Sequence, residues 1–175
     1  MSATPTAPPL LVIMGVSGSG KTTIGGLLAA QLGVPFEDAD GLHPAANVAK
    51  MAAGHPLTDD DRWPWLAVVG AHLAAAEKTG LVMACSALKR SYRRAILDEE
   101  PATRFVFLTG ERELLDARMA ARKGHFMPES LLDSQLATLE PLAPDEPGVT
   151  LVLTAESTPD ELARRAIGLL LARDH

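Results

Sequence analysis

The sequence has 175 residues, of which 47% are hydrophobic and 22% are charged. This composition is typical of a soluble globular protein that is large enough to bury a core, and we expect a single domain. The formal net charge of −6 argues against a general nucleic-acid binder, because such proteins carry a basic face. No apolar run approaches the roughly 20 residues of a membrane helix, so we expect no membrane partner.

The first nine residues and the cysteine content bear on where the protein acts. Residues 1–9 are rich in proline, threonine and alanine, which predicts a disordered tail ahead of a domain at residues 10–175. The tail has no basic residue and no long apolar core, unlike a signal peptide. Cys85 is the single cysteine, which excludes an internal disulfide and is compatible with a reducing compartment. We therefore expect a cytoplasmic protein.

A glycine-rich loop opens the predicted domain. It follows an apolar run at residues 10–14, predicted as a strand, and it precedes a helix-forming stretch that reaches Leu32. Strand, loop and helix in this order are the context in which a GxxxxGK[ST] match indicates a P-loop and not a chance glycine turn. The residues that we expect to bind the nucleotide here are Gly15, Val16, Ser17, Gly18, Ser19, Gly20, Lys21, Thr22 and Thr23.

The residue types of this loop suit a nucleoside triphosphate. Glycines let backbone N–H groups converge on phosphate oxygens, and the N-terminus of the following helix adds a partial positive charge. Lys21 can reach the β and γ phosphates, and the Thr22 hydroxyl can ligate Mg²⁺. The loop therefore predicts that the chain binds a nucleoside triphosphate together with Mg²⁺.

Two acids follow the next predicted strand, at residues 34–37. Asp38 and Asp40 lie one residue apart, and close carboxylates repel each other unless a cation or a donor lies nearby. One could face the Mg²⁺ shell or a substrate hydroxyl, and the other the substrate. Alternatively, both lie in a solvated turn and cap a helix. The P-loop context favours the functional interpretation.

A short predicted helix at residues 45–53 and a longer one after it carry further polar candidates. His43, just before the short helix, is by itself more typical of a turn than of a catalytic base. Lys50 adds a cation on the short helix. Thr58 and Asp61 form a capping pattern at the start of the longer helix, which accounts for part of the acidic run there.

An apolar run at residues 81–85 is typical of a central parallel strand that is covered on both faces. Ser86 and Lys89 follow it, where ligands bind beyond the carboxyl ends of strands in an open α/β sheet. An anionic substrate could meet a helix N-terminus there. This strand does not end in Asp, so the usual metal-binding carboxylate of a P-loop enzyme is missing, and Asp38 could take its place.

Two arginines mark the next helix. After a fourth predicted strand at residues 104–110, a helix at residues 111–121 leads to Arg118 and Arg122 on one face, because they are spaced i, i+4. A surface helix could show this spacing by chance. The helix continues into a basic, glycine-containing turn, which favours a mobile lid at residues 118–128 whose arginines close on the phosphates.

The remaining elements complete the pattern. We expect a returning helix at residues 129–139, a fifth strand at residues 148–154 and a last helix that begins near Ser157. Five strands that alternate with helices predict an α/β fold with a doubly wound, five-stranded parallel sheet. The P-loop then lies at the carboxyl edge of that sheet.

Several runs together resemble the gluconokinase family, small P-loop sugar-acid kinases related to shikimate kinase and to nucleoside monophosphate kinases. These runs cover nearly the whole chain in the expected order. Ala39 departs from the family pattern, which commonly has glycine between the two acids. Besides the P-loop, the matching runs are LHP at 42–44, DDDRWPWL at 59–66, CSALKRSYR at 85–93 and RKGHF at 122–126.

The resemblance implies a kinase that uses ATP and Mg²⁺ to phosphorylate D-gluconate at its 6-hydroxyl, usually as a homodimer. Lys21, Asp38 and Arg122 are then the expected catalytic residues, and Arg118 joins the nucleotide site. Lys89 is the expected partner of the substrate carboxylate, with three arginines as alternatives: Arg62, Arg90 and Arg93. The expected substrate-binding residues are Asp40, His43, Lys50, Arg62, Ser86 and Lys89.

Two rival functions stay open from the sequence. One is a kinase of another small acid, such as shikimate, with the same P-loop and a different substrate pocket. The other is a nucleotide-binding switch that signals to a protein partner. The short chain and the basic segment after residue 118 argue against the switch.

Overall fold

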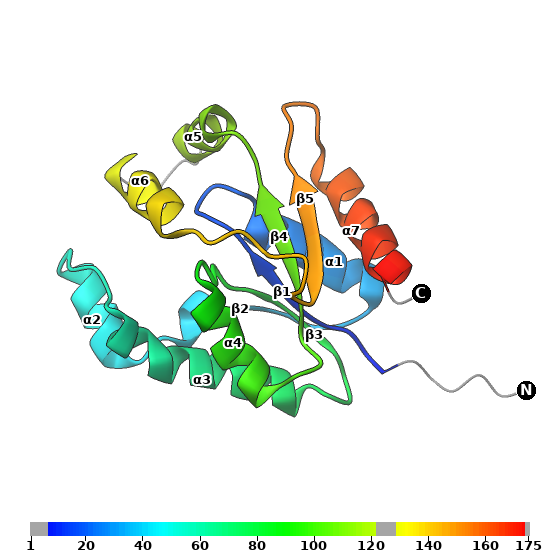
Figure 1. The fold of residues 1–175 in the computed structure, drawn as a ribbon, viewed down its shortest axis with the longest axis horizontal. Coiled ribbons are helices and arrows are strands. Elements are labelled where there is room, and N and C mark those ends of the chain that lie inside the picture. The colour runs from blue at the N-terminus through cyan, green and yellow to red at the C-terminus, as the bar shows by residue number, and fades with distance from the viewer. Residues whose placement is uncertain (1–6, 122–128, 174–175) are drawn as a thin grey trace, which may run out of the picture.

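The structure, a computed structural model, describes residues 7–121 and 129–173. These residues form a five-stranded parallel sheet in the order β2-β3-β1-β4-β5, flanked by helices (Figure 1). Among them, no helix is long and apolar enough to cross a membrane. The strands are β1 (Leu10–Met14), β2 (Phe36–Asp38), β3 (Leu81–Ala84), β4 (Arg104–Thr109) and β5 (Gly148–Val152). The helices are α1 (Lys21–Leu32), α2 (Ala45–Ala52), α3 (Asp59–Ala75), α4 (Arg90–Glu99), α5 (Arg112–Ala120), α6 (Glu129–Thr138) and α7 (Pro159–Arg173), with a 3₁₀ helix, η1, at Ala39–Leu42.

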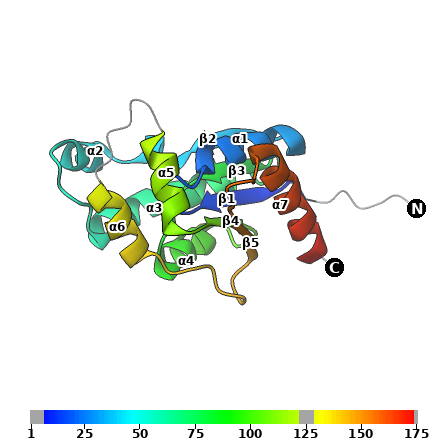
Figure 2. The ribbon, with the colours of Figure 1, turned by 90° about the horizontal axis from the view of Figure 1, so that it is seen from above.

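Alternate residues of β1 face opposite layers of helices. Leu11 and Ile13 belong to a core shared with α1 and α7, whereas Val12 and Met14 belong to a core shared with α3 and α4. Every residue of β1 is buried, as in a central parallel strand that is covered on both faces. Figure 2 shows helices on both sides of the sheet, which confirms the predicted doubly wound α/β fold.

The strand before the two acids begins later than predicted. The N–H of Val34 is used to close the end of α1, where it donates to a helix carbonyl at 3.0 Å. Pro35 has no N–H to give to a ladder, so β2 starts at Phe36 and ends on Asp38 itself.

The carboxyl ends of three strands meet beside the P-loop. The N–H of Gly15, after β1, donates to the carbonyl of Ser86, after β3, over 3.3 Å. Asp38, at the end of β2, pairs in register with Ala84, at the end of β3. The parallel register therefore brings the P-loop, Ser86 and Asp38 to one edge of the sheet, as the sequence predicts.

Helix α1 packs closely on β2 at Gly25. A Cβ placed on Gly25 would come within 2.7 Å of the Phe36 ring. At the neighbouring Gly26, such a Cβ would meet no atom within 4 Å. Glycine at position 25 therefore sets the spacing between α1 and the edge strand, whereas position 26 is open.

Arg93 on α4 is held inside the protein. Its guanidinium donates to both carboxylate oxygens of Glu146, at 2.7 and 3.0 Å, and to the Ala87 carbonyl at 2.8 Å. Ala87 has a φ of +43°, which is strained for a residue with a Cβ, so this last bond supports the loop between β3 and α4. The Arg93 side chain is fully buried. It is therefore a structural residue, and the alternative that it binds the substrate carboxylate is wrong.

Candidate active site

The P-loop curls around the N-terminus of α1. Gly18 and Gly20 have φ angles of +83° and +94°, a conformation that residues with a Cβ adopt only with strain. Nζ of Lys21 donates to the carbonyls of Gly15 and Val16, at 2.9 and 3.0 Å, so the ammonium lies across the loop. A helix N-terminus, loop N–H groups and an ammonium thus come together, an arrangement that suits a chain of phosphates.

Helix α5 covers this loop. A Cβ on Gly18 would lie 2.6 Å from a side-chain atom of α5, and one on Gly20 would lie 3.8 Å from a guanidinium nitrogen of Arg118. The structure thus brings Arg118, one of the predicted nucleotide-binding residues, beside the loop. Residues 122–128, which include Arg122 and most of the predicted lid, lie outside the described part of the chain.

Asp38 serves a helix cap and faces the P-loop at the same time. Its Oδ1 accepts from the N–H of Asp40 at 3.0 Å, which caps η1, and its Oδ2 lies 3.4 Å from Oγ1 of Thr22, which donates to it. The capping interpretation and the functional one therefore concern different oxygens of one carboxylate. Mg²⁺ prefers oxygen ligands and is usually held by one or two carboxylates together with substrate phosphates. The Thr22 hydroxyl and Asp38 Oδ2 have the chemistry of such a site.

The surroundings of Asp40, two residues after Asp38, disfavour the ionised form of its carboxyl. Partial burial, followed by repulsion from Asp38, raises the pKa of Asp40, while the charge of Lys21 acts in the opposite direction. Raised carboxyl pKa values are common where a protein assembles charged groups for function. Asp40 thus lies near the P-loop lysine, and its carboxyl is protonated more readily than that of an exposed aspartate.

His43 is held as a neutral ring. It stacks on Trp65 with 4.1 Å between ring centroids, and its Nδ1 lies 3.2 Å from Nδ2 of Asn47. The same Asn47 nitrogen donates to the Asp61 carbonyl at 2.9 Å, which fixes it as the amide nitrogen. Nδ1 must then accept, so the ring carries its proton on Nε2. Burial is the main cause that lowers the pKa of His43, in agreement with this state.

Three donor side chains surround the carboxylate of Asp59, a grouping that was not predicted from the sequence. The Tyr92 hydroxyl donates to its Oδ1 at 2.5 Å, Nζ of Lys89 lies 3.4 Å from its Oδ2, and Nη1 of Arg62 lies 3.6 Å away. The Tyr92 hydrogen bond is the main cause that lowers the pKa of Asp59. Two cations and one anion meet here, so this group, the Asp59 cluster, has an excess of positive charge.

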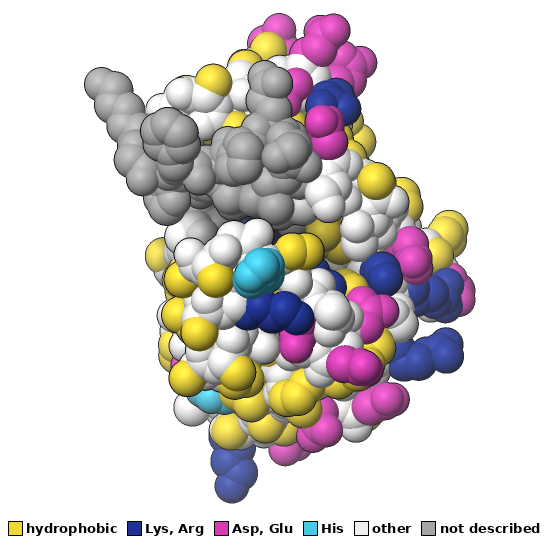
Figure 3. Space-filling model, turned by 90° about the vertical axis from the view of Figure 1, so that its left-hand side faces the viewer, with side chains coloured by type: hydrophobic (Ala, Val, Ile, Leu, Met, Phe, Trp, Pro, Cys, Tyr) yellow, Lys and Arg dark blue, Asp and Glu magenta, His cyan; other side chains and the backbone are white. Residues whose placement is uncertain are grey.

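A second ion pair joins α2 to the start of α3. Nζ of Lys50 lies 2.5 Å from Oδ2 of Asp61, and this bond is the main cause that lowers the pKa of Asp61 to about 2. Thr58 and Asp61 form the predicted capping box at the N-terminus of α3. Figure 3, which views this end of the molecule, shows basic and acidic side chains side by side with a histidine among them.

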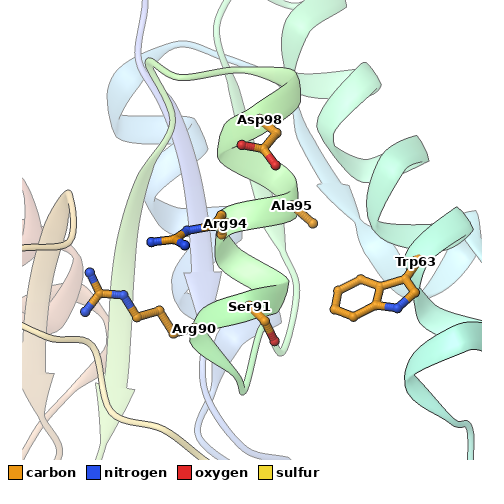
Figure 4. Close-up of a pocket in the computed structure, with 6 residues that line it drawn as sticks. All are labelled: Trp63, Arg90, Ser91, Arg94, Ala95 and Asp98. Carbon is orange, nitrogen blue, oxygen red and sulfur yellow. The ribbon is translucent and has the colours of Figure 1, made fainter.

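Two residues that follow β3 have surroundings unlike those of the candidate site. Cys85 is buried, and burial raises the pKa of its thiol to about 12, so it is not a nucleophile. Arg90 pairs with Asp145 and lines a shallow groove on the outer side of α4, opposite Trp63 (Figure 4). None of the predicted substrate-binding residues lines this groove. The structure thus turns Arg90 away from the Asp59 cluster.

Comparison with known proteins decides between families that share this loop. The chain matches the family described as shikimate kinase over residues 17–168. It is 48% identical over 170 residues to a gluconokinase of Gluconobacter oxydans (strain 621H), covering 95% of this chain and 94% of that protein. The thermoresistant gluconokinase of Escherichia coli (strain K12) is 42% identical over 154 residues, covering 87% of this chain and 88% of that one. The crystal structure of a gluconokinase from Sinorhizobium meliloti 1021 has a TM-score of 0.84 and 46% identity, with 95% of this chain and 93% of that chain covered.

This chain belongs to the gluconokinase family. The match confirms the resemblance drawn from the sequence runs, and it confirms a P-loop kinase fold. In a gluconokinase-family protein, a cluster of two cations, a hydroxyl and a carboxylate is a suitable setting for a small polar acceptor, and its Lys89 follows Ser86, which bonds to the P-loop.

Sequence reasoning missed three residues of this gluconokinase-family site. Asp59 was grouped with a helix cap, and Tyr92 was only part of a matching run. Gln135 on α6 bonds to the P-loop at Ser17, 118 residues away in the chain. The i, i+3 spacing of Lys89 and Tyr92 indicates that they share a face at the start of α4, and the i, i+3 spacing of Asp59 and Arg62 indicates the same on α3. No local signal indicates the contact of Gln135.

Proposed function

We propose that this protein transfers the γ-phosphoryl group of ATP to the 6-hydroxyl of D-gluconate, giving 6-phospho-D-gluconate and ADP. The observation that carries the proposal is a P-loop whose Thr22 faces Asp38 and whose Gly15 bonds to Ser86, three residues before Lys89 of the Asp59 cluster, in a chain of the gluconokinase family. Phosphoryl transfer needs positioning and charge neutralisation more than covalent chemistry. A loop for phosphates next to a cationic cluster meets both needs.

The nucleotide side of the reaction is assigned to the P-loop. The P-loop at residues 15–23 and the N-terminus of α1 would hold the phosphates, with Lys21 at the β and γ phosphates. Arg118, which lies beside Gly20, would add positive charge as the phosphoryl group moves. We assign the same role to Arg122, from the sequence alone.

Mg²⁺ is the expected metal of this site. Thr22 Oγ1 would be a direct ligand, and Asp38 Oδ2 would accept from a metal-bound water or orient the 6-hydroxyl. The metal, when bound, would neutralise charge on the phosphates. A titration of Mg²⁺ at fixed ATP tests this assignment: Thr22→Val should raise the Mg²⁺ concentration for half-maximal rate, and an unchanged requirement would remove Thr22 from the metal.

The acceptor side is assigned to two members of the Asp59 cluster and to polar residues that follow β2 and β3. Asp40, His43 and Ser86 would bind hydroxyl groups of the polyol. Lys89 and Arg62 would hold the substrate carboxylate, since their cluster carries more positive than negative charge. Lys50, which pairs with Asp61, is assigned to the substrate from the sequence alone.

A substrate panel separates this function from its rivals. The purified protein would be assayed with Mg²⁺ and ATP, with ADP release coupled to a colour reaction, in the presence of D-gluconate, shikimate, D-glucose or no acceptor. Gluconate should be turned over at least a hundredfold faster than the others. Preference for shikimate would favour the other small-acid kinase, and slow ATP turnover that ignores every acceptor would favour a switch.

The assembly and location of the protein also remain proposals. We propose a homodimer in the cytoplasm, following the family resemblance. Large apolar side chains are exposed on two adjacent helices, namely Val48 and Met51 on α2 and Val68 on α3. Light scattering across a hundredfold range of concentration tests the dimer, and a monomer throughout that range would contradict it.

A further inference from the structure

A glutamine from α6 bonds twice to one residue of the P-loop. The N–H of Ser17 donates to Oε1 of Gln135 at 2.7 Å, and Nε2 of Gln135 donates to Oγ of Ser17 at 3.0 Å. Both side chains are partly buried. The amide of Gln135 therefore spans the backbone and the hydroxyl of the same loop residue.

The chemistry of these groups fixes which atom is which. A backbone N–H is a donor only, so the amide atom that faces it must be the oxygen. The amide NH₂ must then face Oγ of Ser17, and Oγ must accept from it. Since a hydroxyl has one proton and two lone pairs, the Ser17 proton is left to point away from Gln135.

Ser17 directly follows the part of the loop that the lysine contacts. Nζ of Lys21 bonds to the carbonyls of Gly15 and Val16, the two residues that precede Ser17. A phosphoryl group that pairs with this ammonium would therefore approach the loop next to Ser17. A hydroxyl that already accepts one hydrogen bond is a good donor to an anionic oxygen.

We propose that Gln135 is a positioning residue for phosphoryl transfer, which fixes Ser17 so that its hydroxyl donates to the phosphoryl group of bound ATP. This inference rests on the proposed function, because it takes ATP as the ligand of the loop. Gln135 itself does not contact the nucleotide. It acts on the nucleotide only through Ser17, to which its amide is hydrogen-bonded.

A double-mutant cycle tests the proposal. Gln135→Met has a similar size and loses both hydrogen bonds, and Ser17→Ala loses the hydroxyl. Each should lower kcat about ten- to a hundredfold, less than or similar to the loss of a direct oxyanion donor. The Kd for ATP should stay within about threefold. The double variant should be no slower than the slower single variant, because one function is lost in all three.

Controls separate positioning from a plain structural role. Ser134→Ala, on the exposed side of the same helix, should keep wild-type kinetics. Gln135→Glu keeps an oxygen for the Ser17 N–H but offers a second acceptor in place of the NH₂ group, so it captures the Ser17 proton. At saturating ATP it should show a lowered kcat with a melting temperature close to that of the wild type.

Three results would overturn the proposal. Losses in Ser17→Ala and Gln135→Met that multiply in the double variant would mean independent roles. Tighter ATP binding by Gln135→Met would mean that the amide competes with a phosphate oxygen for the Ser17 N–H. A lower melting temperature with an unchanged kcat would mean that Gln135 only holds α6 against the loop. Wild-type protein that phosphorylates no gluconate would instead contradict the proposed function, and the cycle can then be measured with any acceptor that is turned over.

Discussion

The ionised carboxylate of Asp40 lowers the stability of the folded protein. Partial burial and the neighbouring Asp38 raise its pKa in the folded protein, so the folded state binds this proton more tightly than the unfolded chain does. The stability that this proton contributes is present at low pH and is lost as the pH rises from the usual aspartate value through the folded-state pKa. Such a cost is typical of functional sites.

We expect Asp40→Asn to raise the melting temperature at pH 7, because the amide removes a charge that the folded state disfavours. The gain should shrink as the pH falls and become small near pH 3.5, because the carboxyl is then mostly protonated in both states. Differential scanning fluorimetry from pH 3.5 to pH 8 measures this. Glu77→Gln, at an exposed position after α3, is the control. A gain that stays constant with pH would exclude the titration of Asp40 as its cause.

Lys89 is the residue that we propose as the partner of the substrate carboxylate. Hydrogen bonds to charged groups contribute about 1.5–3 kcal/mol, so Lys89→Met should raise the KM for gluconate about ten- to a hundredfold. The Kd for ATP should hardly change, because the phosphates lie on the P-loop. Arg94→Met, which removes a cation from the outer groove of the next helix, should leave both constants as they are. An unchanged gluconate KM in Lys89→Met would remove Lys89 from the site.

At the level of elements, two adjacent acids tie one loop to α4 in different ways. Glu146 pairs with Arg93 inside the protein, whereas Asp145 pairs with the exposed Arg90. Removing one partner of a buried ion pair leaves a charge without compensation, which costs about 3–5 kcal/mol. An exposed pair contributes about 1 kcal/mol or less.

We therefore expect Glu146→Ala to lower the free energy of unfolding by about 3 kcal/mol or more, and Asp145→Ala by about 1 kcal/mol at most. Urea unfolding followed by tryptophan fluorescence compares the two variants. Equal losses would mean that burial of the Arg93 pair has no energetic consequence. Because Arg93 also holds the Ala87 carbonyl, Glu146→Ala should disturb the loop that leads to Lys89 as well.

Features that a local sequence pattern determines were predicted, whereas contacts between segments far apart in the chain were not. The strand at 81–85 and the capping box at Thr58 follow from local patterns, and both are confirmed. The start of β2 was predicted too early, because the end of α1 competes for Val34. Arg93 looked like one of several available cations, since nothing local reveals that Glu146 lies against it. The contact of Gln135 with the P-loop could not be predicted for the same reason, because its partner Ser17 is 118 residues away.

For the molecule as a whole, nucleotide binding and folding are linked. The P-loop joins β1, the central strand, to α1, so it forms only in the folded state. ATP that binds the folded state alone adds about 2.7 kcal/mol of stability at a hundredfold excess over its Kd. For a chain of this size that corresponds to a rise of roughly 5–10 °C in melting temperature.

Lys21→Ala should abolish most of this rise and lower the transfer rate about 10³-fold or more, because a charge that stabilises the phosphates is lost. Melting curves with and without Mg²⁺ and ATP, beside the coupled assay, measure both effects. Lys78→Ala, at an exposed position after α3, should behave like the wild type. A full ATP-dependent rise in Lys21→Ala would place Lys21 away from the nucleotide.

The close packing of Gly25 on Phe36 reaches further than the fold. Thr22 lies one helical turn before Gly25, and Asp38 lies two residues after Phe36, so each pair shares one face of its element. A methyl group at position 25 would push α1 from β2 and widen the 3.4 Å separation of Thr22 and Asp38. Thr22 is the proposed direct ligand of Mg²⁺, and Asp38 Oδ2 is the proposed acceptor from a metal-bound water, so a wider gap weakens the binding of the metal. Gly25→Ala should therefore raise the Mg²⁺ concentration that gives the half-maximal rate, while Gly26→Ala should not, and the affinity for the metal becomes a property of how tightly one helix packs on an edge strand.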